Sequence, residues 1–362
     1  MSSPTPRPGT IIPSALTASS LPAPATGVPA RPVTDTTPAT GFGAPLSVNP
    51  LPRSGVAALF GRARAAARAS WDEAPGYRRL AYVTGAILIA IGLGHAVLWA
   101  VMGGTASGPL SWRKPVTFGV SFGMTTATLG AVAAHLPVRR WIGWVLSVLL
   151  CSSAAGEVAY ISMQHARGVA SHFNETTPLD KALFQAAGWV IGGMVLVIVV
   201  MAVASFVRTT APAPMAWALR AGLVGLVTAL AAGAWMIMHG DALVDAGATP
   251  LTVSMTTYGA AGAMKSAHAV PMHAVQVLGV IAWLLGLGGL PRRRQVWLVA
   301  MAIAGYAGLF TVLVLRTVAG LPPFGLDASA AAYLIPAGLL AGAGITALSH
   351  ASRAMAADAA RS

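Results

Sequence analysis

The feature that most constrains this chain is a series of long apolar stretches that recur between residues 80 and 349. An α-helix rises about 1.5 Å per residue, so a stretch of about twenty residues crosses a hydrocarbon core of about 30 Å. Only 9% of the residues are charged, whereas soluble domains carry about 25%. The sequence therefore predicts an all-α fold, a polytopic transmembrane helix bundle.

We expect eight transmembrane helices, at residues 80–103, 115–135, 140–163, 182–207, 215–239, 269–290, 296–318 and 330–349. Arginines gather in the connections on one side of this arrangement, for example at Arg139 and Arg140 and at Arg292 to Arg294. The positive-inside rule makes this side cytoplasmic, and an even number of spans places both termini there. The bilayer is thus the expected partner. The same distribution explains the net charge of +13 without nucleic acid, which we do not expect as a partner.

Two segments precede the predicted bundle. Residues 1–52 are rich in Pro, Ser, Thr, Ala and Gly, and such a composition cannot bury enough apolar surface to offset its ordering entropy. We expect a disordered cytoplasmic tail there. Residues 53–79 form a basic juxtamembrane segment, with a short helix over 53–70. At the other end of the chain, residues 350–362 are expected to form a short cytoplasmic tail.

The predicted helix over residues 53–70 combines apolar and basic side chains. Its apolar residues, expected on one side, are Val56, Leu59 and Phe60. Its basic residues, which are suited to anionic lipid headgroups, are Arg62, Arg64 and Arg68. A solvated leader that only sets the orientation of the chain is the alternative interpretation.

The most polar connection between two predicted spans is residues 163–180, MQHARGVASHFNETTPLD. A passive connector needs only a turn and a few polar residues, whereas this one carries donors, acceptors and metal-capable groups. Part of it starts the next helix, with Thr177 as N-cap, Pro178 at the first helical position and Asp180 at the third. The remainder points to a functional site on the outer face of the bundle.

Most of the histidines fall on the outer half of the predicted topology: His95, His165, His172, His239, His268 and His273. Glu157 lies within the third predicted span, and a carboxylate in hydrocarbon is costly, so we expect it to face the bundle interior. Glu157, Tyr160 and Gln164 follow helical spacing and predict a polar stripe on that side. We expect His95, Glu157, His239 and His273 to converge below residues 163–180.

One function compatible with this pattern is metal or haem binding, serving redox chemistry or chemistry on a lipid or quinone. The candidate ligands for zinc, copper or iron are His95, Glu157, His239, His268 and His273. Two histidines from different spans would also suit the axial positions of a haem. The alternative is structural, because each histidine can instead hydrogen-bond a neighbouring helix.

A second compatible function is a transporter or receptor for a small anionic solute. The candidate binding residues are Trp112, Arg113, Lys114, His165, Arg167, His172, Asn174, Gln276 and Arg316. Arg113 and Lys114 lie where positive charge is normally sparse, and a guanidinium beside an ammonium suits a carboxylate or phosphate. The alternative is that Arg113 and Lys114 only anchor the chain at the membrane interface. Arg316 adds a third cation or pairs with Glu157 or Asp327.

Three motifs, SWRKP at residues 111–115, RGVASHFN with TPLD within 167–180, and HAVPMHAVQ at 268–276, resemble a group of bacterial multi-pass membrane proteins without an assigned activity. The resemblance covers roughly residues 80–350 and implies a multi-span protein of the bacterial plasma membrane. No Walker A motif, GxSxG elbow or dinucleotide fingerprint occurs in the sequence. The sequence names no catalytic residue, and a structural or assembly role stays open beside the two binding functions.

Overall fold

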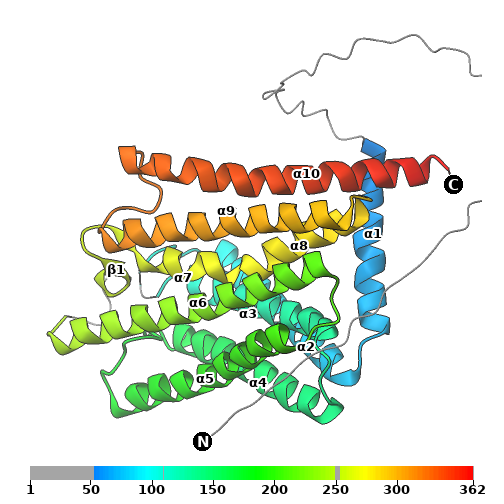
Figure 1. The fold of residues 1–362 in the computed structure, drawn as a ribbon. Helices are drawn as coiled ribbons and strands as arrows, with labels where there is room; N and C mark the ends of the chain where they lie inside the picture. The colour runs from blue at the N-terminus through cyan, green and yellow to red at the C-terminus, as the bar shows by residue number, and fades with distance from the viewer. Residues whose placement is uncertain (1–52, 109, 249–252, 362) are drawn as a thin grey trace, which may run out of the picture. The chain divides into compact units, whose positions relative to one another are not determined.

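The structure, a computed structural model, describes residues 53–108, 110–248 and 253–361, all within one compact unit, Pro50–Ser362 (Figure 1). The tail predicted at residues 1–52 lies outside the described residues. The described chain is almost entirely helical. Its strands are the two-residue β1 (Thr257–Tyr258) and β2 (Gly262–Ala263), which pair antiparallel after the 3-10 helix η2 (Val253–Thr256).

Eight helical segments of the described chain are long and apolar enough to cross a membrane. They are α2 (Gly76–Met102), α3 (Arg113–Val132) with η1 (Ala133–His135), α4 (Arg140–Ala166), α5 (Pro178–Val207), α6 (Ala213–Asp245), α7 (Met264–Met272) with α8 (Ala274–Leu287), α9 (Arg292–Val318), and η3 (Ala328–Tyr333) with α10 (Leu334–Ala359). The predicted all-α bundle of eight spans is confirmed, and the protein is an integral membrane protein.

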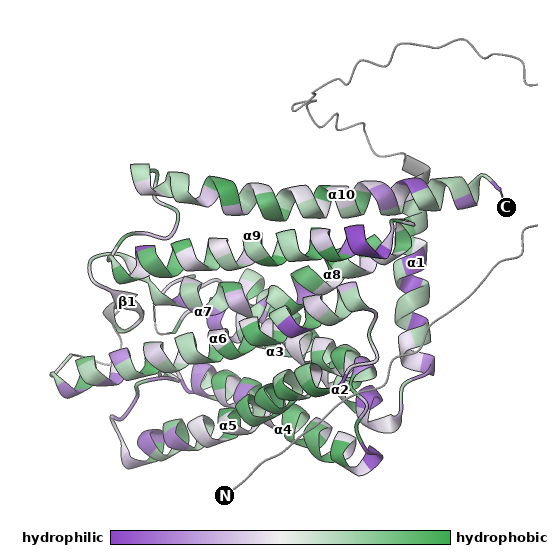
Figure 2. Cartoon of the chain, in the orientation of Figure 1, coloured by the Kyte–Doolittle hydropathy of each residue, from purple (hydrophilic) through white to green (hydrophobic). Residues whose placement is uncertain are grey.

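The outward surface of the spans is suited to lipid. Large apolar side chains such as Trp189, Val101 and Ile335 are largely exposed, and a soluble monomer rarely exposes such a continuous apolar surface. Figure 2 shows apolar residues along the spans, with polar residues concentrated toward the helix ends. The same residues that would aggregate in water are satisfied by hydrocarbon.

The bundle interior is packed by aliphatic side chains and by glycine. One buried cluster includes Leu129, Val197 and Leu223, from α3, α5 and α6. The α2 and α3 backbones approach closely where Gly92 faces Gly119, since a Cβ on Gly119 would lie 2.5 Å from the Cα atom of Gly92. Small residues permit such close approach in lipid, where packing replaces the hydrophobic effect as the driving force.

The helix predicted over residues 53–70 is present as α1 (Arg53–Asp72), which lies across one end of the bundle, roughly perpendicular to the spans (Figure 1). Leu59 is buried against Ala351 and Met355 of α10, so both ends of the described chain lie at this end. Phe60, unlike Leu59, does not pack on α10, because its side chain is 74% exposed. Consecutive helical residues lie about 100° apart, so only one of the two faces α10.

The two ends of the bundle differ in their connections. One end, which we call the arginine end, carries α1 and the connection at Arg292. The other, which we call the loop end, carries the connection between α4 and α5 at residues 167–177. The last helix continues to Ala359, past the predicted end of the span at residue 349, because its alanine-rich sequence favours helix. Much of the predicted tail at 350–362 is therefore helical.

Candidate binding site at the loop end

Three titratable side chains form a row beneath the α4–α5 connection. The Nζ atom of Lys114, in the first turn of α3, lies 3.0 Å from Nδ1 of His172, and Nε2 of His172 lies 4.0 Å from Oε1 of Glu157 on α4. An ammonium can only donate, so Nδ1 accepts and the imidazole proton sits on Nε2, toward Glu157. We call these three residues the Lys–His–Glu row.

The row lies in a largely apolar environment. Only 6% of the Glu157 side chain and 23% of the His172 side chain are exposed. The His172 imidazole contacts the rings of Phe118, Phe173 and Phe184, with ring centroids 6.1, 6.3 and 5.9 Å away. Low polarity strengthens electrostatic interactions and makes an unbalanced charge costly. The charges in the row therefore depend strongly on one another.

Positive charge exceeds negative charge around the row. The ammonium of Lys265, at the start of α7, is within electrostatic range of both Lys114 and His172, and Arg113 is within range of Lys265. Glu157 is the one carboxylate that acts on Lys114 in the described part of the chain. Burial first, and then the ammonium groups of Lys114 and Lys265, hold the pKa of His172 well below its usual range. The imidazole is therefore neutral at neutral pH, in agreement with the hydrogen-bond pattern.

The polar stripe predicted on α4 anchors the connection above the row. Glu157, Tyr160 and Gln164 are all buried, which confirms that this face of the helix points inward. The Tyr160 hydroxyl donates to the Ser171 carbonyl, and the Ser171 hydroxyl in turn accepts from Lys114. Ser171 thus links the α4 stripe to the cation of the row and sets the position of the adjacent His172.

Further contacts within the connection involve two predicted binding residues. Nη1 of Arg167 lies 2.7 Å from Oδ1 of Asp180, and the Asp180 amide donates to Oγ1 of Thr177 at 3.1 Å, which confirms Thr177 as the N-cap of α5. Asn174 is buried and accepts from the Thr176 amide at 3.3 Å. The polar groups of Arg167 and Asn174 are thus engaged in holding the connection.

Phe173, next to His172, adopts a strained backbone with φ of 59°. Residues other than glycine rarely adopt this left-handed backbone conformation, which costs about 1–3 kcal/mol. The ring of Phe173 is buried and packs on Gly240 of α6, where a Cβ atom would lie 2.3 Å from Cε1 of the ring. This close contact holds the strained residue, and with it His172, in place.

The predicted residues His95, Trp112 and His165 lie together, in a separate aromatic row at the loop end. The Trp112 ring is 6.4 Å from that of His95 and 4.3 Å from that of His165, measured between centroids. Nδ1 of His95 lies 2.9 Å from the Ile91 carbonyl of its own helix. Arg113 donates to the Ala106 carbonyl at 3.2 Å.

The remaining predicted histidines lie against backbone carbonyls or at a helix break. His239 Nε2 lies 3.2 Å from the Thr257 carbonyl, and His268 Nδ1 lies 2.7 Å from the Ala229 carbonyl. His273 occupies the break between α7 and α8 and is exposed. Gln276 follows it, and its amide, oriented to satisfy both of its polar atoms, donates to the Met272 and His273 carbonyls at 3.1 and 3.2 Å.

The metal-holding group predicted from His95, Glu157, His239, His268 and His273 is therefore not found in the described residues. Across residues 53–108, 110–248 and 253–361, no three His, Cys, Asp or Glu side chains are grouped so that they could hold a metal ion. Glu157 meets a histidine of the connection instead of histidines from other spans. The reason is that the imidazoles of His239 and His268 are already directed to carbonyls of neighbouring elements.

Arg316 is engaged by an ion pair of its own. Its Nη2 and Nη1 atoms lie 2.6 and 2.8 Å from the two carboxylate oxygens of Asp327, and Nε donates to the Pro322 carbonyl at 3.0 Å. The hydrogen bonds from Arg316 hold the pKa of Asp327 well below its usual range. The guanidinium is 3% exposed and its charge is balanced locally. We call Arg316 and Asp327 the arginine clamp.

The structure adds two residues to the site that the sequence did not single out. Ser171 lies within the RGVASHFN motif, beside His172, and Lys265 lies just before the HAVPMHAVQ motif. For Lys265 a signal was present, since it lies three residues before His268 on the side where basic residues are sparse. For Ser171 no signal distinguishes it from the other serines of the chain.

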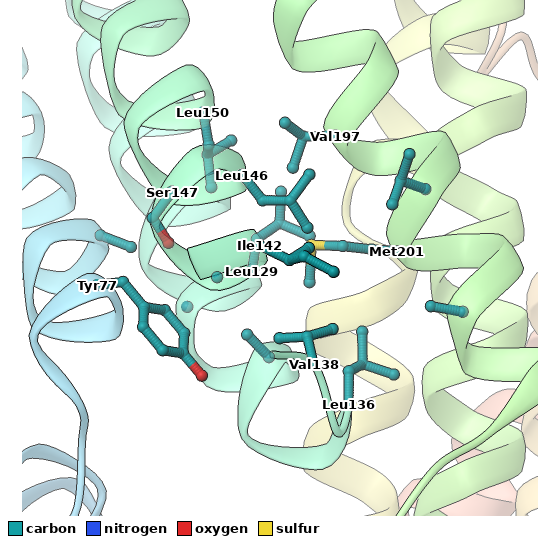
Figure 3. A pocket seen from close by; sticks show the side chains of 16 residues that line it. Tyr77, Leu129, Leu136, Val138, Ile142, Leu146, Ser147, Leu150, Val197 and Met201 are labelled. Carbon is teal, nitrogen blue, oxygen red and sulfur yellow. The ribbon is translucent and has the colours of Figure 1, made fainter. Parts of the chain in front are cut away.

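Two cavities lie elsewhere and are mainly apolar. One, of about 60 Å³, lies near the arginine end between α2, α3, α4 and α5; Figure 3 shows Tyr77 and Ser147 beside its aliphatic lining. The other, of about 320 Å³, is a groove between α4 and α5, where Tyr160 lies among small and aliphatic residues. Neither is lined by a charged residue.

Comparison with known protein families, with characterised proteins and with solved structures finds no significant match. The class of the protein follows from the fold and the site alone. It is a multi-pass integral membrane protein with eight candidate spans and a cationic, largely buried row of titratable groups at one end. The resemblance indicated by the SWRKP, RGVASHFN and HAVPMHAVQ motifs stays a prediction.

Proposed function

We propose that this protein binds a small anionic solute at the Lys–His–Glu row and acts as its transporter or receptor. The observation that carries the proposal is the imbalance of charge at the row. Glu157 is the one carboxylate that acts on Lys114 in the part of the chain that the structure describes, whereas Lys265 is within electrostatic range of Lys114, and Arg113 is within range of Lys265. Uncompensated positive charge in a membrane bundle is expensive, and an anion would relieve it.

The contacts of Lys114 indicate how an anion would be held. Its hydrogen bonds go to the neutral Ser171 hydroxyl and His172 imidazole, so neither of these partners would compete with the negative charge of a carboxylate or phosphate oxygen. The ring of Phe118 lies beneath the ammonium, 5.9 Å from Nζ. It limits the approach of water, which strengthens the attraction between the two charges.

The other two members of the row would handle a proton. A bound anion lowers the cost of charging the neutral His172 imidazole, because it offsets the repulsion from Lys114 and Lys265. When the anion takes over the hydrogen bond of Lys114, Nδ1 of His172 can take up a proton from water. The Glu157 carboxylate, 4.0 Å from Nε2, would then offset the positive charge of the imidazolium. We therefore propose that a proton accompanies the anion.

The location of the site depends on orientation. We propose that the protein lies in the plasma membrane of a bacterium with its arginine end in the cytoplasm, which places the row on the outer side. Reporter fusions at His172 and at Met355, which lie at opposite ends of the bundle, should report opposite sides. Activity of the cytoplasmic reporter at both positions would contradict the proposed orientation.

Metal or haem binding is the other function that the sequence leaves open, together with a purely structural or assembly role. The geometry favours the anion site over a metal site, because the candidate ligands do not gather in the described chain. Elemental analysis and an optical spectrum of the purified protein test this preference. Stoichiometric metal, or a haem absorption band, would reverse it.

The proposed function is tested by calorimetry on the purified protein with acetate, succinate and inorganic phosphate as probes. At least one probe should bind, and Lys114→Gln should weaken its binding about tenfold or more, since a charge-assisted hydrogen bond is lost. The matched control is Lys181→Gln, which removes an exposed lysine paired with Glu175. Binding of no probe, or equal affinity in Lys114→Gln, would overturn the proposal. Uptake of the radiolabelled probe into proteoliposomes then separates a transporter from a receptor.

A further inference from the structure

A second cationic surface lies on α1, at the arginine end. Phe60 and Trp71 are 74% and 42% exposed, and Arg64 and Arg68 are exposed between them. These four positions follow one another at intervals of four, four and three residues, which places them on one face of a helix. We call this face the α1 stripe. Aromatic residues at both ends of an arginine pair are typical of a helix that lies at a membrane interface.

The helix that carries the α1 stripe is anchored at both ends. Leu59 is buried against α10. Near the other end, the Ser70 hydroxyl lies 2.8 Å from the hydroxyl of Tyr82 and accepts from Nη2 of Arg78 at 3.3 Å. Arg78 is itself buried and donates to the Gly130 carbonyl of α3 at 3.0 Å. The orientation of α1 is thus set by the transmembrane helices.

This orientation places α1 along the membrane surface. It lies across the ends of the spans (Figure 1), so it runs along the bilayer surface when the spans cross the membrane. It contacts α10 at Ala351 and Met355, beyond the apolar part of that helix. The α1 stripe therefore lies at the level of the lipid headgroups.

Arg79 adds a cation beside the stripe. It donates to the Trp71 carbonyl at 3.2 Å and to the Asp72 carbonyl at 2.9 Å, and its guanidinium lies 5.5 Å from the centroid of the Trp71 ring. These contacts orient the indole and use only carbonyl acceptors, so the charge of Arg79 is not neutralised by them. The exposed guanidinium stays available to an anionic group.

We propose that the α1 stripe binds anionic phospholipid headgroups in the leaflet at the arginine end. Arg64, Arg68 and Arg79 contact phosphate oxygens, for which the planar guanidinium is well suited. Phe60 and Trp71 insert into the interfacial region, where aromatic rings are favoured. The occupant is the bilayer itself, because the same chain spans it and its anionic lipids complement the arginines. The inference is independent of the anion site at the loop end.

Two measurements on the full-length protein, reconstituted into vesicles, test the proposal. The vesicles contain phosphatidylcholine alone or an equal mixture with phosphatidylglycerol. In the first measurement, an environment-sensitive fluorophore is attached to Phe60→Cys in a Cys151→Ala background, since Cys151 is the only cysteine. The emission should shift to the blue and be quenched by brominated lipid, more strongly with phosphatidylglycerol. A probe that stays in water in both vesicles would overturn the proposal and favour a soluble acidic partner.

The second measurement counts retained phosphatidylglycerol by native mass spectrometry. The double variant Arg64→Gln, Arg68→Gln should retain less phosphatidylglycerol, with a decrease of about fivefold for each arginine removed. The matched control changes Arg292 and Arg293 to Gln; both are exposed at the same end but lie outside the α1 stripe. An equal loss in the control, or none in the α1 variant, would contradict specific binding. Thermal unfolding verifies that both double variants are folded.

Discussion

Lys114 and Arg316 are both cations held at the loop end of the bundle, yet their surroundings differ. Arg316 meets both carboxylate oxygens of Asp327, and its remaining hydrogen bonds go to the Pro322 and Gly325 carbonyls and to the Ser329 hydroxyl. Lys114 donates instead to a neutral hydroxyl and a neutral imidazole, and Glu157, its carboxylate, is reached through His172. One charge is balanced within its own segment, and the other is left in excess.

The difference separates structure from function in this bundle. A cation with its own carboxylate and a full set of acceptors stabilises the segment around it and has little capacity left for a ligand. The same holds for Arg167, which is paired with Asp180. A cation without such balance is a cost to folding unless a ligand repays it, which is why Lys114 marks the candidate site.

The largest effect on stability is expected from breaking the arginine clamp. Asp327→Asn leaves the buried guanidinium of Arg316 without a carboxylate, so the melting temperature should fall by several degrees. Acetate or phosphate affinity should not change, because the clamp is separate from the Lys–His–Glu row. The control is Asp358→Asn, at an exposed position on α10. Loss of anion binding without loss of stability would show that Arg316 belongs to the site.

An intermediate effect is expected from Gly240→Ala. The new Cβ atom would lie 2.3 Å from Cε1 of Phe173, so the ring must move, and overpacking of this kind costs about 1–3 kcal/mol. Because Phe173 adjoins His172, anion affinity should fall together with stability. Gly188→Ala on α5 is the matched control, since a Cβ there meets open space. Equal stability of the two variants would show that Phe173 does not hold His172 in place.

The smallest effect is a pH dependence that belongs to the row alone. The pKa of folded His172 is lowered, so below the unfolded value of about 6.5 the unfolded state binds more protons. Stability should be fully present above about pH 6.5 and should decrease as the pH falls below it. His172→Gln should show a flatter profile of melting temperature against pH. Parallel profiles for the two proteins would remove His172 from the electrostatics of the site.

Sequence patterns determined the class of the protein and several local features. The eight spans follow from the length of the apolar stretches, because hydrocarbon demands continuous apolar helix. The inward direction of Glu157 follows from the cost of a carboxylate in lipid. Thr177 was identified as an N-cap because capping depends on residues within one turn. Each of these follows from solvation or from neighbours in the chain.

The partners of the polar groups were decided only by the tertiary structure. Glu157 faces His172 of the connection rather than histidines of other spans, and Lys265 on α7 comes within electrostatic range of the row. On α1, Leu59 rather than Phe60 faces α10. Hydropathy specifies that a helix is buried in the bundle, but its rotation and its neighbours depend on how side chains from distant segments pack together. That packing involves contacts between residues far apart in the sequence, which no local pattern contains.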